Sequence, residues 1–226
     1  MFITSIFDTA HALFEAAGTL FQSTAQNDSS APYAVLFPGG NTPRPLFQRI
    51  AHAPFPVSSQ VHIGYTDERL VPETNPANNY ALSIPMLTAL DIKQKQILRV
   101  NTNFLLEAAA DDYNNTWHEF FKKDGSIPLA FVGLGTDGHT CSLFTEEQVL
   151  ACPATRYAKA VRRDDGPDRI TITPALLEKI RHIIVLATGP EKAAIVEQVS
   201  QAPDTLVAGK ALATCPRVSI WYAAQQ

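Results

Sequence analysis

LAFVGLGTDGHTCSLF, residues 129–144, is the stretch that decides the fold of this 226-residue chain. Its apolar start, residues 129–132, predicts a buried strand. Three glycines follow, which predict a tight turn rather than more strand: Gly133, Gly135 and Gly138. The turn carries an acid, Asp137, and an imidazole, His139. A strand that ends in such a turn is typical of an active-site loop at the carboxyl end of a parallel strand.

Two other interpretations of this stretch stay open. The glycines also fit the GxGxxG fingerprint of a dinucleotide site, but that fingerprint expects an acid about 20 residues further on. Residues 154–158, Ala-Thr-Arg-Tyr-Ala, contain none, and the fingerprint leaves His139 unexplained. The second interpretation is a structural turn with a hydrogen-bonded histidine.

Composition indicates an ordinary globular protein, with 46% hydrophobic and 18% charged residues. The length allows a sizeable core, and we predict a single domain over residues 1–226. A net charge of −4 argues against recruitment by nucleic acid or anionic membranes, so an anionic ligand needs a local basic cluster. We expect no membrane span, because no apolar run reaches about 18 residues.

The N-terminus does not resemble a signal peptide, because no Lys or Arg precedes Arg44. The three cysteines, Cys141, Cys152 and Cys215, are odd in number and lack CxxC spacing. We therefore expect neither a zinc site nor a disulfide framework, and a cytoplasmic location.

Apolar runs alternate with helical patterns along the chain. Helical spacing predicts a helix over residues 6–21, capped by Asp8 or Thr9. The other predicted helices are 45–52, 78–90, 105–121 and 191–199, and the predicted strands are 33–37, 61–65, 97–100, 129–132, 157–161, 183–187 and 218–221. Strict alternation in residues 169–173 predicts an edge or antiparallel strand. The order predicts an α/β fold with a mostly parallel sheet.

A second glycine turn, Phe37-Pro-Gly-Gly-Asn-Thr-Pro43, follows a predicted strand and precedes a predicted helix. Gly39 and Gly40 permit a tight turn, and Thr42 as N-cap with Pro43 at the first helical position would start the helix. Free N–H groups at such a helix start bind phosphate. The alternative is a plain strand–helix turn.

Two further strand ends carry charge. Asp67, Glu68 and Arg69 are consecutive, so they cannot all share one face. Arg69 is suited to bind a phosphate, and Asp67 would face the polar end of the ligand. The alternative is a surface turn with an incidental ion pair. Lys192 is predicted in the first turn of a helix, where a cation opposes the helix dipole. A bound phosphate would resolve this conflict; the alternative is a solvated lysine. Since carboxyl ends of parallel strands converge, we predict an enzyme acting on a small phosphorylated compound.

In this order, the segments resemble the 6-phosphogluconolactonases. The matching segments are Gly39 to Pro43, Asp67 to Arg69 with Val71-Pro72, Asn78-Asn79-Tyr80, Gly133 to Phe144, Arg169 to Thr173 and Gly189 to Lys192. Asn41 stands where the family usually has Ser, and Cys141 where Ala is common. Nothing is carried over for residues 203–226.

The resemblance implies a three-layer αβα sandwich, Rossmann-like and related to glucosamine-6-phosphate deaminase. It implies hydrolysis of 6-phosphoglucono-1,5-lactone to 6-phosphogluconate in the pentose phosphate pathway, without a metal or organic cofactor. It makes no prediction of oligomeric state. Deaminases, the nearest alternative, have a Glu where this chain has Phe144. The other alternative is a non-catalytic sugar-phosphate sensor.

On this hypothesis His139 is the general base, because an imidazole with an ordinary pKa of about 6.5 can deprotonate water near neutral pH. Asp137 orients His139 or the turn, and Asp67 is the other candidate for orienting it. Backbone N–H groups of the 133–138 turn would stabilise the oxyanion. The expected phosphate cluster is Gly39, Gly40, Asn41, Thr42, Arg69, Arg169 and Lys192.

Overall fold

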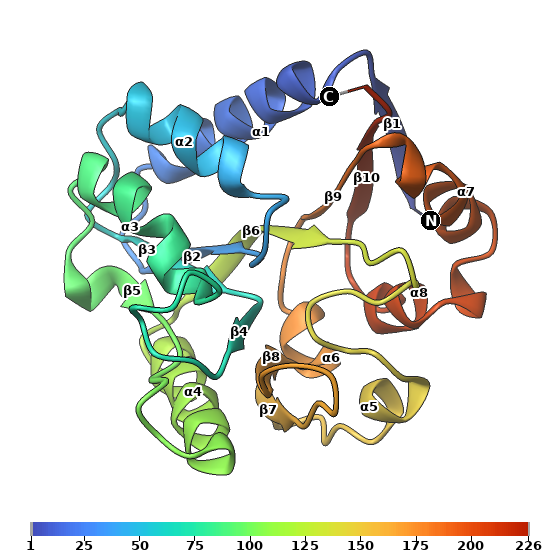
Figure 1. The fold of residues 1–226 in the computed structure, drawn as a ribbon. Coiled ribbons are helices and arrows are strands. Elements are labelled where there is room, and N and C mark those ends of the chain that lie inside the picture. Colours follow the sequence, from blue (N-terminus) through green and yellow to red (C-terminus); the bar gives the residue numbers. More distant parts are fainter. Residues whose placement is uncertain (1, 226) are drawn as a thin grey trace.

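A fully parallel sheet of seven strands forms the centre of the computed structural model, which describes residues 2–225 (Figure 1). Its order is β1-β10-β9-β6-β2-β3-β5. The strands are β1 (Ile3–Phe7), β2 (Tyr33–Phe37), β3 (Val61–Tyr65), β5 (Ile97–Leu98), β6 (Ser126–Gly133), β9 (Ile183–Thr188) and β10 (Val218–Ala223). The predicted α/β class with a mostly parallel sheet is confirmed.

A small antiparallel sheet lies beside the main one, in the order β4-β8-β7. Its strands are β4 (Asp67–Arg69), β7 (Ala158–Val161) and β8 (Arg169–Ile172). The antiparallel strand predicted over 169–173 is confirmed. The strand predicted over 157–161 is present, but it pairs with β8 across a short connection and so lies outside the parallel sheet.

Helices cover both faces of the main sheet. One core contains side chains of α1 (Ala10–Ala25), α2 (Arg44–His52) and α3 (Asn79–Ala89). The other contains side chains of α4 (Leu106–Phe121), α5 (Glu146–Leu150), α6 (Pro174–Leu177), α7 (Ala193–Gln201) and α8 (Val207–Leu212). Successive residues of β6 alternate between the two cores, as a strand's geometry requires. The result is the expected three-layer αβα sandwich.

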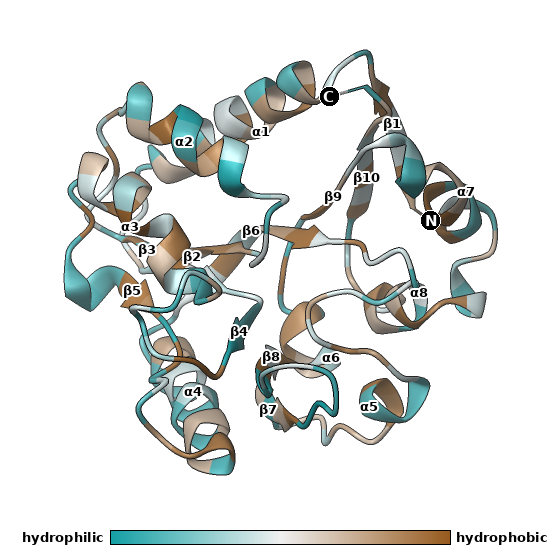
Figure 2. Cartoon of the chain, in the orientation of Figure 1, coloured by the Kyte–Doolittle hydropathy of each residue, from teal (hydrophilic) through white to brown (hydrophobic). Residues whose placement is uncertain are grey.

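The hydropathy of the strands follows this layering (Figure 2). Strands β6 and β9 are brown, and residues 183–187 of β9 are all buried. Strand β4 and the β7–β8 connection are teal. Within residues 2–225, no helix is long and apolar enough to cross a membrane.

The N-terminal prediction was wrong at its start. Residues 3–7 form strand β1, and α1 begins at Ala10. Strand β1 occupies the sheet edge, where Ile6 is 79% exposed, so its apolar residues show no buried alternation. Thr9, one of the two predicted caps, is the N-cap of α1. Its hydroxyl accepts a hydrogen bond from Ala12 N–H at 3.1 Å.

The strand order reverses between β2 and β6. From β2 the chain proceeds through β3 to β5 at one edge, then returns to β6 and continues to β9 and β10 on the other side. Ligands of open parallel sheets bind outside the carboxyl ends at such a switch point. The two glycine turns follow β2 and β6, so the topology places both at this position.

Candidate active site

His139 and Asp137 form a close pair in the loop after β6. Nδ1 of the imidazole lies 2.5 Å from Oδ1 of Asp137, whose Oδ1 also accepts a hydrogen bond from His139 N–H at 3.3 Å. Partial burial alone would raise the pKa of Asp137, but hydrogen bonding and attraction to His139 hold it below its ordinary value. With Nδ1 engaged, Nε2 is the imidazole nitrogen available to a ligand.

Gly135 leaves the space that this pair occupies. A Cβ on Gly135 would lie 2.2 Å from Nδ1 of His139 and 2.3 Å from Oδ1 of Asp137. The loop uses its own N–H groups as well: Gly135 donates to the carbonyl of His139, and Gly138 donates to that of Gly135. These two N–H groups are therefore not free for an oxyanion, contrary to the prediction for them.

The first glycine turn packs against β4 and α3. A Cβ on Gly39 would lie 1.8 Å from Nδ2 of Asn79, and Gly40 has a φ of +84°. Helix α2 begins at Arg44 with Pro43 as N-cap, and no side chain caps it. The prediction of Thr42 as N-cap was wrong by one residue. Fewer donors are free than predicted, because Arg44 N–H binds the carbonyl of Asn41 and Pro45 has no N–H.

Alternation along β4 separates its three charged residues. Asp67 and Arg69 line the same cavity, as a strand places residues two apart on one face. The guanidinium of Arg69 donates to the carbonyl of Ala77 at 3.0 Å, and its buried Nε has no hydrogen-bond partner. A Cβ on Gly40 would lie 3.4 Å from Nη2 of Arg69, so this cation lies against the first glycine turn.

Asp67 is held by neighbours other than His139. Its carboxylate accepts hydrogen bonds from Ser142 Oγ at 2.8 Å and from Thr66 Oγ1 at 3.2 Å. It is 7% exposed. The geometry therefore pairs His139 with Asp137, and it leaves Asp67 as a buried carboxylate facing the cavity.

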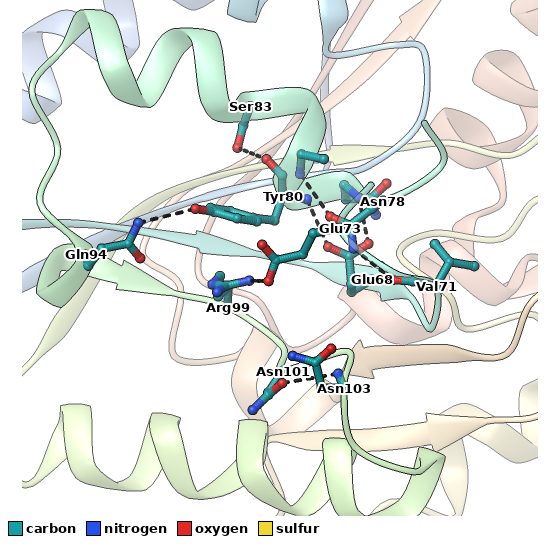
Figure 3. Close-up of polar contacts among 12 residues, drawn as sticks. Glu68, Val71, Glu73, Asn78, Tyr80, Ser83, Gln94, Arg99, Asn101 and Asn103 are labelled. Carbon is teal, nitrogen blue, oxygen red and sulfur yellow. Dashed lines mark hydrogen bonds and ion pairs between the residues drawn. The ribbon is translucent and has the colours of Figure 1, made fainter. Parts of the chain in front are cut away.

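Glu68, on the opposite face of β4, binds the start of α3. Figure 3 shows it beside Asn78 and Tyr80. Its carboxylate accepts from the N–H groups of Arg69, Asn79 and Tyr80 at 2.7–2.9 Å. Burial outweighs these three hydrogen bonds and raises the pKa of Glu68 to about 7. Glu68 thus joins β4 to α3 and does not line the cavity.

Arg169 and Lys192 lie near the cavity but do not line it. Arg169 pairs with Arg69 across β8 and β4, and its guanidinium donates to the carbonyl of Pro167. Burial, then repulsion from Arg69, lowers its pKa. The ammonium of Lys192 donates to the carbonyl of Leu134 at 2.5 Å, and burial lowers its pKa. Lys192 is the last residue of the 3-10 helix Pro190–Lys192 and directly precedes α7, so it lies just before the α-helix rather than in its first turn as predicted.

Phe144 is a neighbour of His139, and Arg163 in turn contacts Phe144; neither was predicted as a site residue from the sequence. The His139 and Phe144 rings lie 4.5 Å apart between centroids, and the guanidinium of Arg163 lies 3.9 Å from the Phe144 centroid. A cation is attracted to an aromatic face at this distance. The contact joins segments 19 residues apart, which no local pattern reveals.

The cavity that collects these groups has a volume of about 150 Å³. Its lining comes from both glycine loops and β4: residues 38–42, Asp67, Arg69, residues 133–135, His139 and Cys141. Burial raises the pKa of the Cys141 thiol, so Cys141 stays a neutral thiol.

A larger, mostly apolar cavity of about 730 Å³ lies between α1 and α2, but it lacks an acid–imidazole pair.

Metal ligands do not gather at this site. Across residues 2–225, no group of three or more His, Cys, Asp and Glu side chains lies close enough to hold a metal ion. The polar side chains that line the cavity include the imidazole of His139, the carboxylate of Asp67 and the guanidinium of Arg69.

Comparison with known proteins supports the resemblance. Residues 8–217 match the family model described as glucosamine-6-phosphate isomerases/6-phosphogluconolactonase. A human 6-phosphogluconolactonase is 30% identical over 87% of this chain and 81% of its own length. Two solved structures share the fold: a Thermotoga maritima 6-phosphogluconolactonase (TM-score 0.83, 20% identity, 99% of this chain and all of that one) and a monomeric glucosamine-6-phosphate deaminase (0.75, 17%, 98% and 97%). This chain belongs to the glucosamine-6-phosphate isomerase and 6-phosphogluconolactonase family.

Proposed function

We propose that this protein hydrolyses 6-phosphoglucono-1,5-lactone to 6-phosphogluconate. The observation that carries the proposal is that His139, paired with Asp137, lines the same cavity as a glycine turn and Arg69. An acid–imidazole pair suits water activation, and a guanidinium beside a glycine turn suits a phosphate. The similarity to curated 6-phosphogluconolactonases supports the same substrate.

In the proposed mechanism, His139 takes a proton from a water molecule through Nε2. The Nδ1–H donates to Asp137, which holds the tautomer and orients the ring. The water oxygen attacks the lactone carbonyl carbon, a tetrahedral oxyanion forms, and the C1–ring oxygen bond breaks. The imidazolium returns the proton to the departing ring oxygen, which becomes the hydroxyl of the product.

The phosphate of the substrate is remote from the reacting carbon. We assign it to Gly39, Asn41, Thr42 and Arg69, with Arg169 and Lys192 adding positive charge around the cavity. Gly40 shapes this turn, since its N–H is bonded to Oδ1 of Asn79. Binding energy gained there positions the carbonyl against the water, so loss of a phosphate ligand lowers kcat as well as raising KM. Asp67 would accept a hydrogen bond from a sugar hydroxyl.

Phe144 separates this proposal from a deaminase. Glucosamine-6-phosphate deaminases carry a carboxylate at the equivalent position, whereas here an aromatic ring packs against His139.

The three cysteines are unpaired thiols. Unpaired thiols fit a reducing, cytosolic setting, which we propose together with the activity.

The direct test is lactone hydrolysis with 6-phosphogluconolactone made in situ and the unphosphorylated lactone in parallel, after subtraction of spontaneous hydrolysis. We expect a rate well above background that strongly favours the phosphorylated lactone. Hydrolysis at the background rate by folded protein would refute the proposal. Deaminase activity or sugar-phosphate binding without turnover would then identify the alternatives.

The same assay tests the base. His139→Ala should lower kcat by about 10²–10⁴-fold, because that is the usual contribution of a positioned general base. Binding of 6-phosphogluconate should remain, since the phosphate ligands are untouched. A variant that kept full kcat would show that another group activates the water.

A further inference from the structure

Asn79 is a buried side chain that connects two parts of the candidate site. It is the first residue of α3 and is 1% exposed. Its Oδ1 accepts a hydrogen bond from Gly40 N–H at 3.2 Å, and its Nδ2 donates to the carbonyl of Asp67 at 2.9 Å. Because one partner can only donate and the other can only accept, they fix the orientation of the amide.

The first glycine turn is built around this amide. A Cβ on Gly39 would lie within 2.1 Å of three atoms of the Asn79 side chain. No side chain fits at residue 39 while Asn79 keeps its place. The contact of Gly39 with Asn79 and the hydrogen bond of Gly40 therefore hold the turn against the start of α3.

The connection continues to the loop that carries His139. Asp67, whose carbonyl binds Asn79, accepts a hydrogen bond through its carboxylate from Ser142 Oγ at 2.8 Å. Ser142 lies three residues after His139, and its N–H donates to Thr171 Oγ1 at 3.1 Å. A chain of hydrogen bonds, Gly40–Asn79–Asp67–Ser142, thus links the first glycine turn to the histidine loop, and its last two bonds are buried.

We propose that Asn79 is a positioning residue that sets the distance between the first glycine turn and His139, and thereby makes the enzyme selective for a lactone phosphorylated at its far end. The inference rests on the proposed function. A phosphate held by the turn can hold the lactone carbonyl at the imidazole only if that distance is fixed. An unphosphorylated lactone does not use the turn and is insensitive to its position.

Asn79→Ala tests this inference, with kcat/KM measured for both lactones. We expect the ratio of phosphorylated to unphosphorylated kcat/KM to fall about tenfold or more, since both hydrogen bonds of the amide are lost. A merely structural role would lower both values together and leave the ratio unchanged. That outcome, in a folded and active variant, would refute the inference while leaving the proposed function intact.

Asn78→Ala is the matched control. Asn78 is the N-cap of α3, accepting from Ala81 N–H, and its amide also donates to the carbonyl of Val71, but it does not contact the glycine turn. Loss of a cap destabilises the helix that it starts. This variant should therefore have a lower Tm and an unchanged ratio between the two lactones.

Gly39→Ala supplies a second route if Asn79→Ala does not fold. It keeps α3 and the amide but forces the turn away from Asn79, so the same ratio should fall. In the Gly39→Ala/Asn79→Ala double variant the methyl group introduced at position 39 has room, and the two effects should be strongly non-additive. Full additivity would mean that Asn79 does not act through the turn. Absence of lactonase activity in the wild-type protein would refute the proposed function instead.

Discussion

Single residues decide whether the imidazole is held for catalysis. Gly135 is the clearest case, since a Cβ there would overlap both partners of the His139–Asp137 pair. The atoms that it would meet are side-chain ends, so the side chains would turn aside more readily than the backbone. The local sequence predicts the pair itself, because both residues belong to one turn, but the need for glycine at 135 follows only from the fold.

Gly135→Ala should lower kcat by about 10–100-fold, because the imidazole loses its orientation. The Tm should change little, since no core contact is removed. Gly18→Ala in α1 is the control, because Gly18 lies outside the cavity and a Cβ there would meet its nearest side-chain atom only at 3.5 Å. Steady-state kinetics on both variants would decide the matter, and equal losses of kcat would contradict this role of Gly135.

At the scale of elements, helix α3 and strand β4 are joined through a buried acid. The pKa of Glu68 is raised to about 7 in the folded protein, above the ordinary value of 4.5. The folded state therefore binds more protons than the unfolded state between these values. Stability from this group is fully present below about pH 4.5 and is lost as the pH rises through about 7.

Glu68→Gln should remove this pH dependence. Between pH 5 and pH 8, the wild-type protein should lose up to about 3 kcal/mol of stability relative to the variant. Denaturant unfolding at several pH values measures the difference. Glu73→Gln, which removes a half-exposed acid that pairs with Arg99, should keep the wild-type slope. If the stability of Glu68→Gln fell with pH as steeply as that of the wild-type protein, a group other than Glu68 would be responsible.

Elements with a buried, uniform environment were predictable from sequence. Strands β2 and β3 have the predicted bounds, because short apolar runs between turns leave few alternatives. Strand β4 was missed because it consists of three charged residues, two of them buried only through partners elsewhere in the chain. Helices α5, α6 and α8 have four to six residues, too few for an amphipathic pattern, and packing stabilises them.

The site as a whole depends on contacts distant in sequence. His139 and Asp137 could be predicted because a local motif carries them. The Gly40–Asn79 hydrogen bond joins residues 39 apart, and Ser142–Asp67 joins residues 75 apart. No periodicity encodes such pairs, so Asn79 was visible in the sequence only as part of a matching segment.

A ligand that spans these segments should stabilise the whole molecule. With 6-phosphogluconate at about 100 times its Kd, linkage predicts about 2.7 kcal/mol of added stability and a Tm higher by several degrees. Gluconate at the same concentration should give little shift, because it lacks the phosphate. Thermal unfolding with each compound is the measurement. Equal shifts for both would contradict the assignment of the glycine turn and Arg69 to phosphate.

The pairing of β1 with β10 has a consequence for biosynthesis. These strands lie at opposite ends of the chain, yet they are parallel neighbours, with Ile3 opposite Ser219 and Phe7 opposite Ala223. While the polypeptide is still emerging from the ribosome, the first strand has no partner to join. The edge of the sheet can therefore be completed only after translation has passed residue 223, which makes its docking a late event in folding.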